Sequence, residues 1–276
     1  MFEVIFLIVL GLIWILFAVV QDLKKREIAN WLNFSLIIFA LGFRLFYSLF
    51  FDSNLIFFYQ GLIGFVLFFF LGNMLYYGRV FAGGDAKLMI ALGAILPLSE
   101  SLYANLNLFF LFFILFLIVG AVYGLIFSLV LAIRNNKNFK REFTRKFVKN
   151  RMLFHVSLIV SLIFVFISFF NRIFIYPAIL VFLSPYIYFS AKAIDEVCMI
   201  KKVPVSKLTE GDWLYKDVRI GRKIIKASWD GLSREEINLL KNRYKKVLIR
   251  RGIPFSPVFL ISYLIFFLLI NKISFI

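Results

Sequence analysis

The sequence has very few residues of the kinds that build metal and disulfide centres. Its 276 residues include one cysteine, Cys198, and one histidine, His155. A single cysteine excludes a disulfide framework within the chain and any four-cysteine zinc site. A single histidine argues against a histidine-rich metal centre, and no convincing Ser-His-Asp or Cys-His set can be assembled around it. We therefore expect neither a metal ion nor another cofactor, and we assign His155 a structural role at the start of a helix.

Charged residues are also scarce, and those present are unevenly distributed. Charged residues make up 17% of the chain and hydrophobic residues 62%, and 32 basic residues stand against 15 acidic ones. So apolar a chain cannot be a soluble globule. The basic residues lie in a few loops between long apolar runs, which is the positive-inside pattern of membrane proteins. We expect these loops to face anionic lipid headgroups of the bilayer, and we expect no nucleic-acid partner.

The apolar runs predict an all-α polytopic membrane protein with about eight transmembrane helices in the cell membrane. A helix needs about 20 apolar residues to cross a bilayer, and the fourth predicted span is short for a complete crossing. Loops rich in lysine and arginine alternate with loops that lack them, which places both termini outside. The predicted spans are 1–20, 31–50, 55–77, 86–98, 107–133, 152–170, 173–190 and 259–270.

One sizeable hydrophilic region interrupts the apolar runs. Residues 192–252 contain 16 basic and 8 acidic residues, and they predict a small basic cytoplasmic α+β domain. This domain would lie between a membrane domain, 1–191, and a final transmembrane helix within 253–276. Its first part has short β-like runs separated by glycine. Its second part begins with a capping box at 233–236 and is predicted to continue as an amphipathic basic helix to about Arg250.

Two carboxylates are notable because they lie at the cytoplasmic ends of predicted spans. Asp22 follows the first span, and Asp85 follows Gly83 and Gly84 directly before the short fourth span. An ionised aspartate beside lipid is costly unless it is solvated, paired or protonated, so such residues are functional candidates. The two glycines let the backbone or an extended substrate come close. The alternative interpretation is that Asp85 only caps a helix that begins at Ala86.

Asp22 and Asp85 are sufficient for peptide hydrolysis if the fold brings them together. Two carboxyls held close to each other cannot both ionise at neutral pH. The protonated carboxyl can donate to the scissile carbonyl while the ionised one accepts a proton from the attacking water. This chemistry needs no metal and no covalent intermediate. We expect Lys87 either to orient Asp85 or a lipid headgroup, or only to extend from the helix end toward water.

The segments around both aspartates resemble the type IV prepilin peptidase family, and more closely its archaeal preflagellin and prepilin peptidase branch. The similarity consists of Asp22-Leu23 followed by basic residues and Ile28-Ala29-Asn30, and of Gly83-Gly84-Asp85-Ala86-Lys87-Leu88 at the start of a helix. Members of this family are membrane aspartyl proteases of the GxGD class, so the resemblance implies catalytic roles for Asp22 and Asp85. Two residues depart from the family motifs: Ala82 replaces the first glycine of GxGD, and Ala29 replaces a common proline.

The resemblance also implies a substrate class. Such enzymes remove the short basic leader from type IV pilin-like or archaeal flagellin precursors, cutting just before the hydrophobic segment. An active site at the cytoplasmic face of the membrane suits this cleavage, because the apolar helix of the precursor stays in the bilayer. Bacterial members often add N-methylation and a cysteine-rich loop. Because Cys198 is alone, we expect neither the zinc loop nor methyltransferase activity.

Three other functions remain open at this point. A presenilin-type intramembrane protease also uses GxGD aspartates, although in this chain two helices separate Asp22 from Asp85. An ion- or proton-coupled transporter would use the same two aspartates as ion sites. A non-catalytic membrane scaffold would use its cytoplasmic domain to bind a partner.

Overall fold

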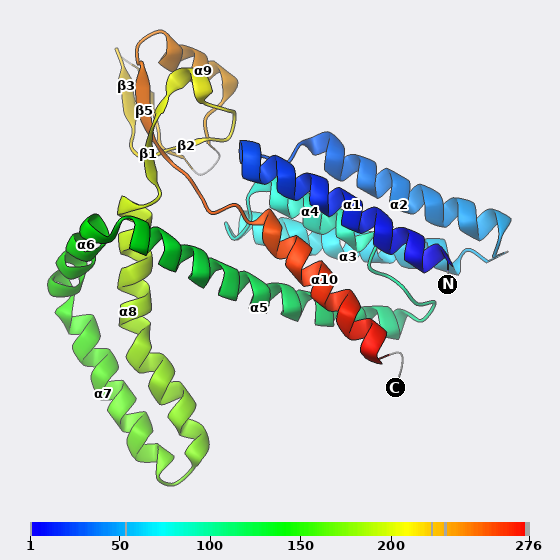
Figure 1. Cartoon of the computed structure of the whole chain (residues 1–276), viewed down its shortest axis with the longest axis horizontal. Helices are drawn as coiled ribbons and strands as arrows, with labels where there is room; N and C mark the ends of the chain where they lie inside the picture. Colours follow the sequence, from blue (N-terminus) through cyan, green and yellow to red (C-terminus); the bar gives the residue numbers. More distant parts are fainter. Residues whose placement is uncertain (1, 53, 222, 229–230, 274–276) are drawn as a thin grey trace. The chain divides into compact units, whose positions relative to one another are not determined.

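The computed structural model describes residues 2–52, 54–221, 223–228 and 231–273, and it is mainly helical (Figure 1). The chain divides into two compact units. The first comprises Met1–Gly124 and Pro254–Ile276, and the second comprises Leu125–Ile253. The division therefore falls within the long helix α5, Leu102–Arg134.

The first unit is a bundle of helices that includes both ends of the chain (Figure 1). Besides the first part of α5 it contains α1 (Phe2–Lys25), α2 (Asn30–Phe50), α3 (Ile56–Tyr77), α4 (Gly83–Gly93) and α10 (Ser256–Ile273). Helix α10, which is last in sequence, packs against α1, which is first: the Tyr263 hydroxyl donates to the carbonyl oxygen of Ile8 at 3.0 Å.

Six helices of the described chain are long and apolar enough to cross a membrane. They are α1, α2, α3, α5, α7 (Arg151–Ser168) and the segment Arg172–Val197, which contains a short 3₁₀ turn followed by α8 (Ile175–Val197). A shorter apolar helix, Ser256–Ile270, belongs to α10. These helices confirm the predicted polytopic membrane protein.

Helix α4 is shorter than the sequence predicts. It was expected over 86–98, but it begins at Gly83 and ends at Gly93. Its 11 residues correspond to about 16 Å, roughly half of the hydrocarbon thickness of a bilayer. Helix α4 is therefore not one of the crossing helices.

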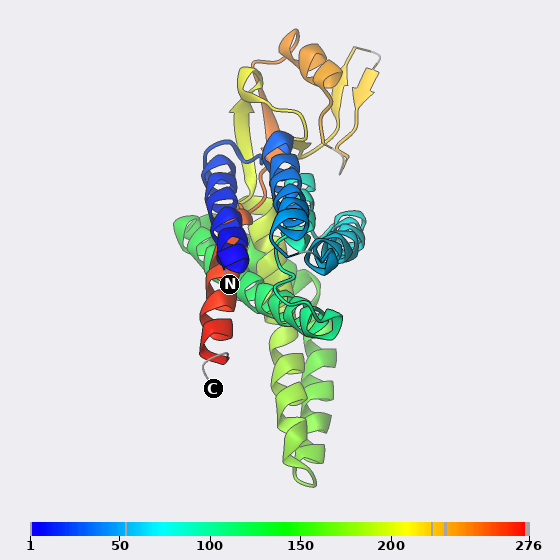
Figure 2. The ribbon, with the colours of Figure 1, turned by 90° about the vertical axis from the view of Figure 1, so that its right-hand side faces the viewer.

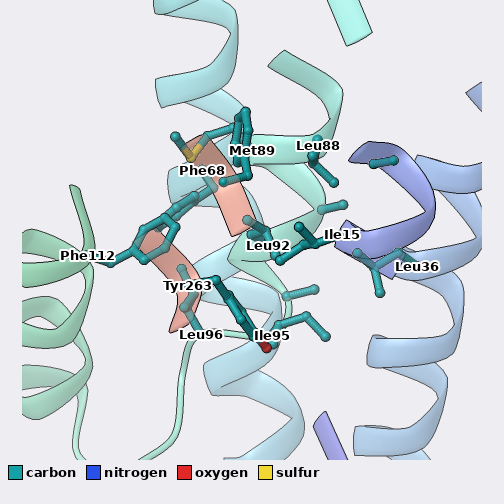
Figure 3. Close-up of a cluster of buried hydrophobic side chains, with 14 of the residues drawn as sticks. Ile15, Leu36, Phe68, Leu88, Met89, Leu92, Ile95, Leu96, Phe112 and Tyr263 are labelled. Carbon is teal, nitrogen blue, oxygen red and sulfur yellow. The ribbon is translucent and has the colours of Figure 1, made fainter. Parts of the chain in front are cut away.

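The core of the first unit is built around α4. Its buried side chains include Leu88, Met89 and Leu92, and the chain after it contributes Ile95 and Leu96. Figure 3 shows these side chains packed with residues from α1, α2, α3, α5 and α10, namely Ile15, Leu36, Phe68, Phe112 and Tyr263. All five of the surrounding helices thus hold α4 in place.

Helices α3 and α4 approach each other at two glycines. A Cβ built on Gly93 would lie 2.5 Å from the carbonyl oxygen of Gly64, and one built on Gly64 would overlap the carbonyl oxygen of Gly93. Small residues allow such close contact between helix backbones, and this contact is typical of helix packing in membranes.

After α4 the chain is no longer helical but still lies inside the core. Arg44 of α2 donates hydrogen bonds to carbonyl groups of this segment. Arg44 is fully buried. Its Nε donates to the carbonyl of Ala94 at 2.9 Å, its Nη1 to that of Phe57 at 2.9 Å, and its Nη2 to those of Ile95 and Pro97. Irregular backbone within an apolar interior is tolerated only when such polar groups are paired.

Two amide side chains, Asn105 and Gln60, bind the rest of the segment after α4. Together with Arg44 we call them the anchor of α4. The Asn105 Oδ1 accepts from the N–H groups of Leu98 and Ser99, each at 3.0 Å, and its Nδ2 donates to Gln60 Oε1 at 2.9 Å. Gln60 in turn donates to the carbonyl of Glu100 at 3.0 Å. The segment between α4 and α5 is thereby tied to both α3 and α5.

In the second unit the end of α5 is followed by α6, α7 and α8, and α6 was not predicted. Residues 134–151, between the predicted spans 107–133 and 152–170, were expected to form a basic loop. Instead, α6 occupies Asn136–Lys149. Phenylalanines 139, 143 and 147 recur every four residues and form one apolar face, with successive ring centroids 6.0 Å apart. This spacing, typical of an amphipathic helix, was obscured by the high density of basic residues. Helices α7 and α8 follow as a hairpin (Figure 1).

The strands of the described chain follow α8. They are β1 (Ile200–Pro204), β2 (Trp213–Leu214), β3 (Val218–Ile220), β4 (Lys223–Ile225) and β5 (Lys246–Arg250), with α9 (Arg234–Lys241) between β4 and β5. Strands β1, β5 and β2 form an antiparallel sheet in that order, in which Ile200 pairs with Arg250. Strands β3 and β4 form a separate antiparallel pair. Figure 2 shows the strands in yellow to orange with α9 beside them.

The prediction of one helix from residue 233 to about Arg250 is only partly correct. The capping box is confirmed: Glu236 N–H donates to Ser233 Oγ at 3.3 Å, and Ser233 N–H donates to Glu236 Oε2 at 2.9 Å. However, α9 ends at Lys241, and residues 246–250 form the central strand β5. Burial alternates along β5, a period of two that specifies a strand. The predicted α+β region is thus present, while its limits at 192 and 252 stay predictions.

The anchor at the end of α4 predicts a large loss of stability when Arg44 is replaced. In Arg44→Met the side chain keeps its length, but four buried carbonyl groups lose their donor. An unsatisfied buried acceptor costs about 1–3 kcal/mol, so we expect a destabilisation of at least about 3 kcal/mol. Thermal unfolding in detergent would measure it. The matched control is Arg172→Met at an exposed position. Equal unfolding midpoints for the two variants would contradict a stabilising role of Arg44.

Candidate active site

Three segments that are far apart in the sequence meet at one end of the first unit. They are the turn between α1 and α2, the start of α4 and the start of α10. Lys87 Nζ of α4 donates to Asn30 Oδ1 of α2 at 2.7 Å. The backbone N–H of Ser256, the first residue of α10, donates to Asp22 Oδ2 of α1 at 3.1 Å. The two sequence motifs and the last helix therefore share one site.

Asp22 lies in the last turns of α1 and is 8% exposed. Its carboxylate accepts the N–H of Ser256 and faces the N-terminal end of α10. The first N–H groups of a helix have no partner within the helix, and the N-terminal end carries a partial positive charge. Both features interact more strongly with an ionised carboxylate than with a neutral acid. Helix α10 thus provides a built-in partner for the negative charge of Asp22.

Asp85 is the third residue of α4 and is 9% exposed. The pKa of Asp85 is raised to about 7, first by burial and second by the nearby Asp22 carboxylate, while a backbone hydrogen bond at Ala82 acts in the opposite direction. The two carboxyls are therefore close enough to interact electrostatically. Asp85 is not the N-cap residue, because α4 begins at Gly83 and Ala82 occupies the N-cap position.

The two glycines before Asp85 are in different surroundings. A Cβ on Gly84 would lie 3.2 Å from the Cβ of Ile28, so a side chain there would push against the α1–α2 turn. A Cβ on Gly83 would meet only Tyr76, at an ordinary 3.7 Å. Gly84 also accepts a long hydrogen bond, 3.4 Å, from Asn33 Nδ2 through its carbonyl oxygen. Close approach of the two motifs therefore depends on Gly84.

The two departures from the family motifs are compatible with the local backbone. Ala82 has φ −71° and ψ 159°, which any residue adopts, so the first glycine of GxGD is not needed for its conformation here. Ala29 has φ −63°, the value that proline imposes. Its N–H donates to Gln21 Oε1 at 3.0 Å, a hydrogen bond that proline could not form. Where proline would fix φ through its ring, Ala29 instead forms a hydrogen bond to α1.

Sequence reasoning did not find two groups that shape the site. One is the N–H of Ser256, and the other is Tyr123 of α5, whose hydroxyl donates to the carbonyl of Pro254 at 2.9 Å and fixes the chain just before α10. The available sequence signal was Pro257, since proline is common in the first turn of a helix. It locates the start of α10 but says nothing of Asp22.

A groove of about 380 Å³ lies on another face of α4, between α2, α3 and α4. Most of its lining is apolar, and Gly83, Ala86 and Lys87 border it at the start of α4. Asn33 also lines the groove; this side chain is 1% exposed, and its Oδ1 has no hydrogen-bond partner. The groove thus offers apolar surface and one buried acceptor next to the second motif.

Residues 9–131 match the type IV leader peptidase family. This segment contains Asp22, Asp85 and the whole of α2, α3 and α4. We refer to residues 9–131 as the leader peptidase segment. The structure places both motifs of the leader peptidase segment at one site, together with a helix, α10, that lies outside the matched residues.

Two archaeal relatives carry the name preflagellin peptidase. The protein from Methanocaldococcus jannaschii is 37% identical over 89 residues, which are 32% of this chain and 37% of that protein. The protein from Methanococcus maripaludis strain C6 is 32% identical over 90 residues, which are 32% of this chain and 38% of that protein. The similarity thus spans less than two fifths of each relative. No solved structure matches significantly.

These matches confirm the predicted resemblance, including its archaeal branch. They do not favour a presenilin-type protease or a transporter. Within the described residues, no three His, Cys, Asp or Glu side chains are grouped as metal ligands. The absence of a cofactor from the reaction stays a prediction.

Proposed function

We propose that the chain is a membrane aspartyl endopeptidase that removes the short basic leader from flagellin or type IV pilin-like precursors. The observation that carries this proposal is the pair Asp22 and Asp85, two buried carboxyls that interact within the leader peptidase segment. The names of the relatives favour a flagellin precursor as the substrate.

The surroundings of the two carboxyls suggest different roles for them. Asp85, whose pKa is raised to about 7, would carry the shared proton and donate it to the oxygen of the scissile carbonyl. Asp22, whose carboxylate accepts the N–H of Ser256 at the start of α10, would take a proton from the attacking water. Proton sharing of this kind is the established logic of carboxyl pairs in aspartic proteases.

The reaction balances without any further component. The water oxygen bonds to the carbonyl carbon, one water proton passes to Asp22, and the Asp85 proton passes to the carbonyl oxygen. In the second step the C–N bond breaks as Asp22 gives its proton to the departing amine. Asp85 recovers a proton from one hydroxyl of the tetrahedral intermediate. The products are a carboxylic acid and an amine, and the pair again holds one proton.

The position of the site along the chain suits a precursor anchored in the bilayer. Asp22 is followed by Lys24, Lys25 and Arg26, and Arg79 precedes Asp85. Such basic residues favour a cytoplasmic location for this end of the bundle. The groove between α2, α3 and α4 would contact the apolar segment of the precursor. The Asn33 Oδ1 could accept an N–H from its extended backbone.

Gly83, Gly84 and Lys87 would support the catalytic pair without reacting. The hydrogen bond from Lys87 to Asn30 ties α4 to the start of α2, and Gly84 lets Ile28 pack against α4. Both contacts keep Asp85 at a fixed position relative to α1. Because Lys87 Nζ donates to Asn30, a role in holding the two motifs together is better supported than a direct contact with Asp85.

Replacing either aspartate with asparagine tests the function. A general acid or base contributes about 10²–10⁴-fold to a rate, so we expect Asp22→Asn and Asp85→Asn each to lose leader removal by at least about 100-fold. Cleavage of a membrane-inserted flagellin precursor by the purified chain, followed as a size shift, would measure it. Asp52→Asn, at an exposed position just after α2, is the control.

Thermal unfolding of all three variants would show whether they fold. Cleavage that persists in a folded Asp22→Asn or Asp85→Asn variant would remove that carboxylate from the mechanism. A wild-type chain that cleaves neither flagellin nor pilin-like precursors would contradict the peptidase itself.

Ser256 allows the role of α10 to be tested with two substitutions at one position. Ser256→Pro removes the N–H that reaches Asp22, while proline is well tolerated as the first residue of a helix. A hydrogen bond to a charged group contributes about 1.5–3 kcal/mol, so we expect cleavage to fall about tenfold or more. Ser256→Ala keeps the N–H and should stay within about twofold of wild type. Equal rates for the two variants would show that the N–H is not needed.

A further inference from the structure

A basic pocket in the second unit has no part in the proposed peptidase reaction. It lies between α6 and α8 and has a volume of about 500 Å³. Four cationic side chains line it, together with one amide and one aromatic ring: Arg145, Lys146, Lys149, Lys192, Asn150 and Phe189. Such a concentration of positive charge around a cavity of this size suits an anion.

Two nearby acids neutralise only part of this charge. Lys146 Nζ pairs with Glu196 Oε1 at 2.6 Å, and Arg145 Nη2 pairs with Glu142 Oε1 at 2.6 Å. Within the described part of the chain, neither Lys149 nor Lys192 forms an ion pair within 4.0 Å, although Glu196 also attracts Lys192 electrostatically. Lys192 Nζ instead lies 4.8 Å from the centre of the Tyr188 ring. Four cations and two acids leave an excess of two positive charges at the pocket.

The pocket also has an apolar base. Phe189 of α8 is fully buried, and its ring centroid lies 5.7 Å from that of Phe147 on α6. Phe147 packs in addition against Phe154 of α7 and Tyr186 of α8, at 5.2 and 5.8 Å. These contacts fix α6 against the α7–α8 hairpin and hold the basic side chains around one cavity.

Apolar surface continues from the pocket along the hairpin. Helix α7 and the segment containing α8 are long and apolar enough to cross a membrane, and they expose large apolar side chains such as Val156, Leu183 and Ile187. A ligand with an anionic head and apolar tails can therefore meet charge at the pocket and apolar surface beyond it. A free phosphate ion would use only the first of these two features.

We propose that this pocket binds the phosphate headgroup of an anionic membrane lipid. Lys149 and Lys192 supply the unpaired charges, Arg145 adds hydrogen-bond donors at the rim, and Phe189 closes the base. Basic pockets between membrane helices are a known means of binding anionic headgroups. The lipid would hold α6 at the membrane surface, where its basic and aromatic faces meet the headgroup and acyl regions.

Lipid binding to the purified full chain tests the proposal. The probes are vesicles of phosphatidylcholine with and without phosphatidylglycerol, and native mass spectrometry would count lipids that remain bound. In the double variant Lys149→Gln/Lys192→Gln we expect the affinity for phosphatidylglycerol to fall at least about tenfold. The control is Lys201→Gln/Lys202→Gln, which removes the same charge from exposed positions of β1.

Three results would overturn the proposal. The first is an equal loss of affinity in the control, which would mean that charge alone attracts the lipid. The second is retention of phosphatidylcholine as strong as that of phosphatidylglycerol. The third is binding of inorganic phosphate as tight as that of the lipid, which would assign the pocket to a free anion. Because these residues belong to the second unit and both aspartates to the first, leader cleavage in detergent should be unchanged in both variants, and the two proposals can fail independently.

Discussion

The position of Asp85 depends on how a half-length helix is held inside an apolar bundle. Helix α4 ends at Gly93 within the core, where its last carbonyl groups cannot reach water. Arg44 donates to the carbonyl groups of Ala94 and Ile95 directly after α4, and Asn105 Oδ1 accepts the N–H of Leu98 further along the segment. The guanidinium also places positive charge at the C-terminal end of α4, where the helix dipole favours a cation. This buried anchor fixes the depth of α4 and so sets where its first turn, with Asp85, meets α1.

The two carboxyls are unequal because different elements surround them. Asp85 is enclosed by the packed core around α4, with no cation among the groups that shift its pKa. Asp22 instead receives an N–H from α10, a helix more than 200 residues away in sequence. Burial penalises charge on the first carboxyl, and a helix N-terminus stabilises it on the second. In the proposed reaction, this difference in surroundings assigns the role of proton donor to Asp85 and that of proton acceptor to Asp22.

The sequence could locate Asp22 and Asp85 because charge within an apolar chain is costly and therefore conspicuous. It could not identify Ser256, since a backbone N–H is common to nearly all residues and only the tertiary structure selects one. Arg44 was not identified from the sequence either, because hydropathy does not reveal hydrogen bonds to carbonyl groups. Residues 246–250 were assigned to a helix because lysines and arginines hid the two-residue alternation of a strand. The class of polytopic membrane protein followed from composition, whereas the polar contacts that position the site did not.

The most direct test of the unequal pair is a measurement of where its proton resides. Infrared spectroscopy separates the carbonyl stretch of a protonated carboxyl from the bands of carboxylates. Since the pKa of Asp85 is raised to about 7, a protonated-carboxyl band should be present at pH 6 and disappear as the pH rises through about 7. It should be missing in Asp85→Asn and titrate at lower pH in Asp22→Asn. A band that persists in Asp85→Asn, or no such band in the wild-type chain at pH 6, would contradict the account.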